Sequence, residues 1–347
     1  MKQFYILIIL LFWNFFNGNA QTVDVATGLS NPRGMVIIEN ELYFCELFRV
    51  SKIDITVSTP TPTLVVENLL LPESIAQNGN ELYNAEYDGN KISKIDLTET
   101  MPTATNVLTG LNGPTGILFN EDNLYFAQAL AGKISKIDIT ENTPTVTDVV
   151  KGLSGPTGIV LIGNDLYISE VYDGKISKID ITETTPTATD VVTDLVAPRG
   201  IAFSGNELYI AEFGADKISK IDITAPVPTP KDVIIGVDGP QGLKIKENDL
   251  YISNSGTNKI VKLDLTTLST EKPQLVNSIN LYPNPSSNFI QVKGLYQTEN
   301  YTIYNVIGEK VMSGNISNNE KLIINKLENG LYLFKLDNGN TIKFIKQ

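Results

Sequence analysis

The chain has 347 residues, with 27 Lys and Arg against 39 Asp and Glu, a net charge of −12 and no His. The absence of imidazole excludes Ser-His and Cys-His nucleophile pairs, a His general base and His-ligated metals. The acidic balance argues against a nucleic-acid partner, because affinity for the phosphate backbone depends on clustered Lys and Arg. Chemistry with oxygen ligands, or binding without chemistry, remains.

Residues 1–20 have the layout of a cleaved secretory signal. Lys2 supplies one positive charge, an apolar run follows from Phe4 to Trp13, and small residues including Ala20 precede Gln21. The apolar run is too short for a comfortable membrane span, although an uncleaved anchor is the alternative. We therefore expect a signal peptide over 1–20.

Residues 21–270 are periodic. The motif Lys-Ile-Asp, with Leu in the last copy, recurs every 42 residues and places its Asp at 54, 96, 138, 180, 222 and 264. A Leu-Tyr pair and a Pro-x-Gly turn recur with it, and each unit contains four short β-branched runs bounded by turn residues. Four strands per 42-residue repeat predict an all-β fold, a six-bladed β-propeller.

The count of strands also predicts how the ring closes. A segment typical of the fourth strand, Val23 to Val25, precedes the first unit, whereas the sixth unit stops at Leu265 without one. We therefore expect the N-terminal strand to complete the last blade, which removes an exposed sheet edge.

Two rings of variable side chains are expected to share one funnel, because the innermost strand begins on the face where the antiparallel second strand ends. The first ring follows the Pro of each turn: Arg33, Glu73, Thr115, Thr157, Arg199 and Gln241. The second ring follows each Leu-Tyr segment: Glu46, Glu86, Gln128, Glu170, Glu212 and Asn254. Four units add an aromatic residue nearby: Phe48, Tyr87, Tyr172 and Phe213.

These rings have two interpretations. The carboxylates of the second ring could each cap backbone N–H groups of their own turn. Alternatively, the funnel is a glycan or peptide site in which aromatics stack and charged groups bind polar atoms. For the second interpretation the predicted ligand-binding residues are Arg33, Glu73, Glu86, Tyr87, Gln128, Glu170, Tyr172, Arg199, Glu212, Phe213, Gln241 and Asn254. No catalytic residue is predicted.

The repeat resembles the NHL-type and gluconolactonase-type six-bladed propellers over about residues 22–270, through Pro-x-Gly-Ile, Leu-Tyr-Ile and the Gly turn into Lys-Ile. The gluconolactonase resemblance implies a channel Ca²⁺ held by acidic or amide residues before the inner-strand Gly. Only Glu73 supplies such a ligand here, while Arg33 and Arg199 place positive charge there. We therefore predict no metal and no cofactor, and keep a Ca²⁺-dependent lactonase or esterase as the alternative.

Residues 271–277 are a predicted linker, and 278–347 predict a small antiparallel β-sandwich with Gly and Asn-Gly turns. This region resembles the type A C-terminal sorting domain of the type IX secretion system of Bacteroidetes. The motif positions are Tyr282, Pro283, Asn284, Pro285, Gly308, Gly330, Lys343 and Lys346. The resemblance implies contact with the secretion machinery and export through the periplasm to the cell surface or the medium.

Charge follows the same division. Residues 276–347 carry a net charge of +2, whereas residues 21–275 carry −15. The sequence therefore predicts an exported, monomeric propeller that binds a surface glycan or peptide. A scaffold that gathers other secreted proteins on its acidic outer surface is a further alternative.

Overall fold

The computed structural model describes residues 22–270 and 280–347, except 294, 296–297, 307 and 337–340. The predicted signal peptide and linker lie outside the described residues. The chain divides into two compact units between Thr270 and Glu271. The helices of the described residues are three 3-10 helices: η1 (Ala129–Ala131), η2 (Phe213–Ala215) and η3 (Leu265–Thr270). None of these is long and apolar enough to cross a membrane.

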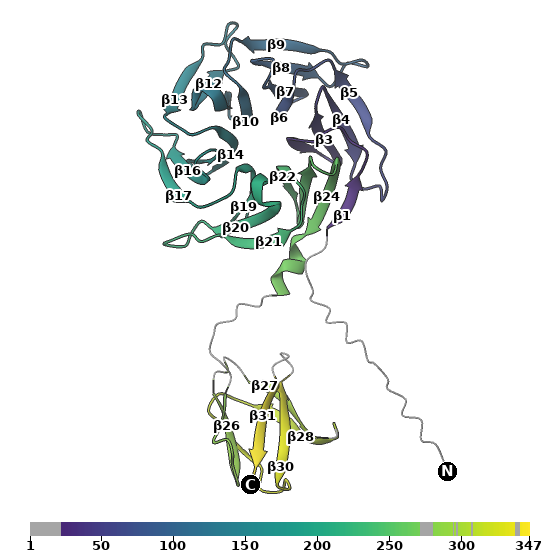
Figure 1. The fold of residues 1–347 in the computed structure, drawn as a ribbon, viewed down its shortest axis with the longest axis vertical. Coiled ribbons are helices and arrows are strands. Elements are labelled where there is room, and N and C mark those ends of the chain that lie inside the picture. Colours follow the sequence, from purple (N-terminus) through teal and green to yellow (C-terminus); the bar gives the residue numbers. More distant parts are fainter. Residues whose placement is uncertain (1–21, 271–279, 294, 296–297, 307, 337–340) are drawn as a thin grey trace, which may run out of the picture. The chain divides into compact units, whose positions relative to one another are not determined.

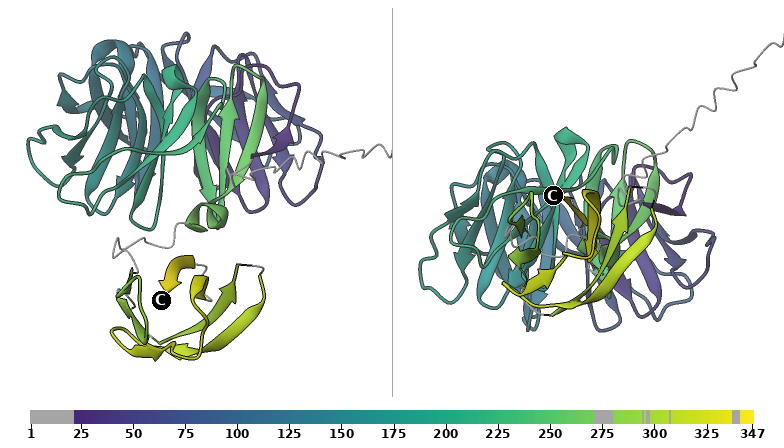
Figure 2. Two further views of the ribbon diagram at one scale, coloured as in Figure 1. Left: turned by 60° about the horizontal axis from the view of Figure 1, so that its bottom comes forward. Right: turned by 90° about the horizontal axis from the view of Figure 1, so that it is seen from below.

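The first unit contains six four-stranded antiparallel sheets arranged as a ring, which Figure 1 shows from above and Figure 2 from other directions. The innermost strands are β2 (Met35–Ile38), β6 (Pro72–Asn78), β10 (Pro114–Asn120), β14 (Pro156–Ile162), β18 (Pro198–Ser204) and β22 (Pro240–Lys246). The second strands are β3 (Glu41–Glu46), β7 (Glu81–Glu86), β11 (Asn123–Gln128), β15 (Asp165–Glu170), β19 (Glu207–Glu212) and β23 (Asp249–Asn254). The predicted all-β propeller is confirmed, and its six sheets are the blades.

The two outer strands complete each blade. The third strands are β4 (Arg49–Asp54), β8 (Lys91–Asp96), β12 (Lys133–Asp138), β16 (Lys175–Asp180), β20 (Lys217–Asp222) and β24 (Lys259–Asp264). The outermost strands are β5 (Thr63–Glu67), β9 (Ala104–Thr109), β13 (Thr147–Lys151), β17 (Thr189–Val192), β21 (Lys231–Ile235) and β1 (Val23–Ala26).

The N-terminal strand closes the ring, as predicted. β1 pairs antiparallel with β24, with Val23 opposite Lys262, so the sixth blade has the order β1-β24-β23-β22. This pairing joins the two ends of the propeller sequence in one sheet. It also covers the edge of β24, which would otherwise present unpaired backbone groups.

Hydrophobic cores lie between neighbouring blades. The described residues form six such clusters in the propeller, one at each blade interface. The cluster that joins the last blade to the first contains Phe44, Leu42, Tyr251 and Ile260, all buried. The second strands contribute most because both of their faces meet a neighbouring blade, which explains their nearly continuous apolar run.

The Asp of each Lys-Ile-Asp motif ends the third strand with a turn. Asp54 Oδ1 accepts hydrogen bonds from the backbone N of Thr56 at 2.8 Å and from its Oγ1 at 2.6 Å. The same pair recurs in the other five blades. The motif therefore sets the start of the Thr/Pro segment that follows.

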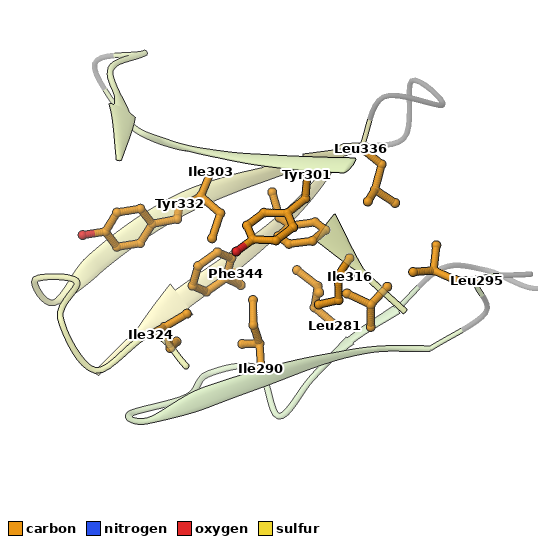
Figure 3. Packing of buried hydrophobic residues seen from close by; sticks show 12 residues of the cluster. Leu281, Ile290, Leu295, Tyr301, Ile303, Ile316, Ile324, Tyr332, Leu336 and Phe344 are labelled. Atoms are coloured by element: carbon orange, nitrogen blue, oxygen red, sulfur yellow. The ribbon is translucent and has the colours of Figure 1, made fainter. Parts of the chain in front are cut away.

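The second unit is the predicted sandwich. One sheet has the order β25 (Asn280–Tyr282), β26 (Phe289–Lys293), β29 (Lys321–Ile323). The other has the order β28 (Lys310–Ile316), β27 (Glu299–Asn305), β30 (Gly330–Leu336), β31 (Thr341–Lys346). Figure 3 shows side chains from both sheets, among them Ile290, Ile303 and Phe344, gathered between them.

Candidate functional site

A cavity of about 640 Å³ lies at the centre of the ring, between the six innermost strands. We call it the central channel. The residue after each Pro of the Pro-x-Gly turns lines it, in blade order Arg33, Glu73, Thr115, Thr157, Arg199 and Gln241. The structure therefore brings the whole first ring of variable residues together.

The Gly of each Pro-x-Gly turn allows the innermost strands of neighbouring blades to lie in backbone contact. A Cβ on Gly158 would lie 2.3 Å from the carbonyl oxygen of Arg199 in the next blade. One on Gly242 would lie 2.4 Å from the carbonyl oxygen of Arg33, where the last blade meets the first. In the second blade Ser74 takes this place, and its Oγ accepts a long hydrogen bond of 3.4 Å from Ile117 N. Glycine thus lets adjacent innermost strands touch through their backbones.

Arg33 and Glu73 form an ion pair between the first two blades. Both side chains are largely buried, with 11% and 15% of their surface exposed. The bond uses one terminal nitrogen of Arg33, while its Nε is buried without a hydrogen-bond partner among the described residues. The ion pair therefore lies in the channel wall and leaves Nε of Arg33 without a hydrogen bond.

Arg199 lies in the fifth blade and has no carboxylate partner in the described part of the chain. Its Nη1 donates to Gln241 Oε1 at 3.0 Å, and its guanidinium lies 4.4 Å from the ring centre of Phe213. Its Nε is also buried and unpaired among the described residues. Burial lowers the pKa of Arg199, against the attraction of nearby Glu73. The protein thus keeps a poorly compensated cation in the channel.

Two Thr residues of the first ring serve the ring itself. Thr115 Oγ1 donates to the carbonyl oxygen of Pro156 at 2.9 Å, and Thr157 Oγ1 donates to that of Pro198 at 3.3 Å. Each bond reaches the next blade. Arg33 and Arg199 also reach the next blade, at Glu73 and Gln241, but each keeps an unpaired Nε that the Thr hydroxyls do not have.

The second ring is not part of the channel wall, which corrects that part of the predicted site. Its side chains are buried, and none lines the cavity. The members are Glu46, Glu86, Gln128, Glu170, Glu212 and Asn254. Five of them accept a hydrogen bond from a backbone N–H of the loop entering their own blade, at Ser30, Leu70, Asn112, Ser154 and Val196. The capping interpretation describes these five positions.

The carboxylates of this ring also pair with the cation that begins the third strand. Glu86 lies 3.4 Å from Lys91 and Glu212 lies 3.4 Å from Lys217, the first residues of their third strands. In the third blade, which has Gln128, Lys133 pairs with Asp148 at 2.7 Å. Lys175 and Lys217 pair with an outer-strand Asp as well, at 2.8 Å each, so the Lys has a carboxylate partner both in blades with Glu and in the blade with Gln128.

The four aromatic residues separate into three groups. Tyr87 and Tyr172 line the channel, and Tyr172 is 69% exposed. Phe213 packs on Arg199 instead, and Phe48 is exposed outside the cavity lining. Of these four aromatic residues the channel lining therefore contains the two tyrosines, beside Phe119 and Phe203 of the innermost strands.

Lys244 also lines the channel, although it belongs to neither ring predicted from the motifs. It lies three residues after Gln241 on β22. Burial lowers the pKa of its ammonium group. The corresponding residues of the other blades are apolar: Val36, Ala76, Leu118, Val160 and Ala202. A single Lys at a position that is apolar in the other five blades is the sequence feature that points to this residue.

The divalent cation implied by the gluconolactonase resemblance does not fit these residues. Within the described ranges, no three Asp, Glu or Cys side chains gather in a way that could hold a metal. Glu73 is the one carboxylate of the described channel lining, and it is paired with Arg33. Calcium takes six to eight oxygen ligands, several of them carboxylates. A cation would also face Arg199.

The predicted sorting motifs meet in the second unit. Asn284 donates from Nδ2 to the carbonyl oxygen of Lys343 at 2.9 Å and accepts from Ile345 N at 2.9 Å. Lys346 Nζ donates to Asn329 Oδ1 at 3.3 Å, beside Gly330 at the start of β30. Gly308 has a φ of +82°, which suits glycine in the turn after β27. Asn284 and Asn329, which are distant in sequence, thus both bind the last strand.

The fold and the channel define a class of protein: a six-bladed β-propeller whose central channel is lined by both charged and apolar side chains, followed by a β-sandwich. Residues 280–347 match the family model described as the secretion system C-terminal sorting domain. The match confirms the predicted sorting domain and its route, export by type IX secretion to the cell surface or the medium. It also implies contact with that system's machinery.

Solved structures share the propeller fold. A chain of a nidogen/laminin complex is 17% identical with a TM-score of 0.58, over 65% of this chain and 89% of that chain. An auxiliary nutrient binding protein from Bacteroides thetaiotaomicron is 16% identical with a TM-score of 0.57, over 68% and 69%. Virginiamycin B lyase from Staphylococcus aureus is 17% identical with a TM-score of 0.54, over 71% and 98%. At such identities the likeness shows the fold alone. The comparison with curated proteins found no match.

Proposed function

We propose that the propeller is a monomeric binding module that holds a small polar ligand, from a glycan or a peptide, in its central channel. The sorting domain accounts for where the protein acts, and the channel accounts for what it does there. One solved structure with a similar propeller is described as an auxiliary nutrient binding protein, and this description is consistent with a binding role.

The unpaired guanidinium donors carry this proposal. Nε of Arg33 and Nε of Arg199 are buried beside the cavity without partners among the described residues. A buried donor left unpaired costs about 1–3 kcal/mol, so a ligand acceptor that meets it after a small rotation of the guanidinium would recover that free energy. The cavity volume of about 640 Å³ falls in the range of ligand sites, about 300–1,000 Å³.

Tyr172 adds an exposed aromatic ring to the aliphatic and phenylalanine side chains that also line the channel. A Cβ on Gly155 would lie 2.6 Å from the ring of Tyr172, so glycine lets this ring lie against the backbone. Tyr172 nevertheless keeps most of its surface exposed at the channel. An exposed ring held by its backbone contact suits stacking on a sugar ring or an apolar side chain.

Glycan and peptide arrays probed with the full chain without its signal segment test the proposal. The best binder is then titrated calorimetrically into wild type, Tyr172→Ala and Arg199→Thr. Thr is the residue that blades three and four carry at the position of Arg199, so the fold should tolerate it. Phe48→Ala is the matched control, because Phe48 is an exposed aromatic outside the channel lining.

We expect Tyr172→Ala and Arg199→Thr each to weaken binding about tenfold or more, and Phe48→Ala to leave it nearly unchanged. Unchanged affinity in both channel variants would contradict the proposal. Binding that persists in them but disappears in moderate salt would favour the scaffold alternative, with its acidic outer surface.

A further inference from the structure

The charges that line the central channel are opposite to those of the propeller around it. Residues 21–275 carry a net charge of −15. The charged residues of the described channel lining are Arg33, Arg199, Lys244 and Glu73. Three cations against one carboxylate leave an excess of two positive charges. An acidic protein that concentrates cations in its central cavity has a local preference for anions there.

Two of these cations are close enough to influence each other. Burial lowers the pKa of Arg199, and the positive charge of Arg33 lowers it further. Glu73 offsets part of this repulsion, but among the described residues it forms its ion pair with Arg33. Glu73 therefore neutralises one guanidinium, and Arg199 keeps its charge with only an amide and a ring as partners.

Lys244 is the third cation. No carboxylate of the described residues lies within ion-pair distance of its ammonium group. The residues at the same position of the other five blades are apolar. A largely buried ammonium group without a partner lowers the stability of a fold. An anion that enters the cavity would offset this cost.

We propose that the central channel selects a small ligand carrying a carboxylate, because Arg199 and Lys244 both line it and neither has a carboxylate partner among the described residues. This inference rests on the proposed binding function and names the chemistry of its ligand. A guanidinium donates two parallel hydrogen bonds to a carboxylate, and an ammonium adds a point charge. The carboxylate belongs to an acidic sugar or to the C-terminus of a peptide.

The surroundings limit the size and charge of this ligand. The cavity holds about 640 Å³, which suits one to a few sugar or amino-acid units. A long polyanion would extend over the acidic outer surface and be repelled there. The channel therefore favours one or two carboxylates on a compact ligand over an extended polyanion.

Four probes separate the sources of the carboxylate. Digalacturonate is compared with neutral digalactose, and Ala-Ala-Ala with a free C-terminus is compared with its C-terminal amide. Each is titrated into the full chain without its signal segment. The variants are Arg199→Thr and Lys244→Leu, which copy residues that other blades carry at the same positions, Thr157 and Leu118.

We expect at least one carboxylate probe to bind about tenfold or more tightly than its neutral partner. Lys244→Leu should weaken that probe about tenfold while raising the midpoint of thermal unfolding, because the buried ammonium is removed. A purely structural Lys would not give this opposite pair of changes. The pair of probes that responds identifies the sugar or the peptide as the source.

Two results would overturn the inference. If neutral probes bind as tightly as the carboxylates, and Tyr172→Ala weakens them while Lys244→Leu does not, the channel binds ligands but does not select anions. The proposed function then stands alone. If neither these probes nor any array member binds in a way that depends on Tyr172 or Arg199, both the inference and the proposed function fail.

Discussion

Asn84 has a side chain whose polar atoms its buried environment leaves unpaired. It is completely buried in β7, and neither its Oδ1 nor its Nδ2 has a hydrogen-bond partner among the described residues. The other five blades place an apolar residue there: Phe44, Phe126, Ile168, Ile210 and Ile252. A buried amide without partners costs free energy that an alkyl group does not.

We expect Asn84→Ile to raise the free energy of unfolding by about 1–3 kcal/mol, because it removes two unpaired polar atoms. Urea unfolding of the full chain measures this change. Asn84→Asp is the matched variant and should destabilise, since it places a charge where the amide lacks partners. A loss of stability in Asn84→Ile would show that the amide has a role these contacts do not reveal.

Glu170 tests whether the second ring is structural. Its Oε2 accepts from Ser154 N at 2.7 Å, as Gln128 does from Asn112 N at 3.0 Å one blade earlier. Glu170→Ala should lower the free energy of unfolding by about 1–3 kcal/mol, because the loop N–H loses its acceptor. Glu170→Gln should cost less than about 1 kcal/mol, since Gln128 already performs this task.

Neither change at Glu170 should alter the affinity of a channel ligand measured by calorimetry. Glu170→Gln leaves Lys175 with Asp190, its second partner at 2.8 Å. Reduced ligand affinity in a folded Glu170→Gln would restore the second ring to the binding site.

The site could be predicted from the sequence only in part, and the reason is visible at single residues. Arg33 and Arg199 stood out because Thr or Gln replaces them in other blades, and both line the channel. Glu86 and Gln128 vary as well, yet both side chains are buried outside the channel lining and accept a hydrogen bond from a loop N–H. Sequence shows that a position varies, whereas burial and hydrogen bonds show what the side chain does there.

At the scale of the element, the innermost strands depend on backbone contact across the blade interfaces. A Cβ on Gly158 would meet the carbonyl oxygen of Arg199 at 2.3 Å. We expect Gly158→Ala to lower the free energy of unfolding by about 1–3 kcal/mol, because neighbouring strands must separate. Ser74→Ala, at the same position of the second blade, should change it much less, since a Cβ is already accommodated there.

Urea unfolding of both variants checks this contrast. If both variants lose the same free energy of unfolding, the added Cβ at Gly158 does not force the innermost strands apart, which would contradict the prediction. Because Arg199 supplies the carbonyl oxygen in question, Gly158→Ala should also weaken a channel ligand, whereas Ser74→Ala should not.

At the scale of the whole molecule, one repeated carboxylate links the fold to pH. Hydrogen bonds from a Thr hydroxyl and a backbone N–H lower the pKa of Asp54, Asp96, Asp138, Asp180, Asp222 and Asp264. Hydrogen bonding from Lys133 lowers the pKa of Asp148 to about 2. Burial opposes ionisation of Glu46, but hydrogen bonds from Arg49, Ser51 and Ser30 outweigh it and lower its pKa.

A carboxyl group whose pKa is lower in the folded state stabilises the fold above its unfolded pKa, about 4. That contribution disappears as the pH falls through the folded pKa. We therefore expect the thermal midpoint of the full chain to fall steeply between about pH 4 and pH 2. Between pH 8 and 6 it should stay nearly flat, because the sequence has no His. Circular dichroism melts at each pH measure it, and a marked drop between pH 8 and 6 would contradict this origin.

The propeller itself was largely predictable because its repeat is strict. The six copies of the 42-residue repeat predict the number of blades, and the fourth-strand segment at Val23 predicts the closing strand that pairs with β24. The sandwich followed from its turn motifs. Lys244 shows the limit of such a prediction: the sequence shows that the other blades have an apolar residue at this position, but only the structure shows that Lys244 lines a cavity.

The most direct test of the central claim is to locate the ligand. Crystals of the full chain without its signal segment, grown with the best array binder, would show where that molecule lies. We expect it in the central channel, with an acceptor atom within hydrogen-bond distance of Arg199 and a face against Tyr172. A binder found on the outer edges of the blades, with the channel filled only by water, would contradict the claim.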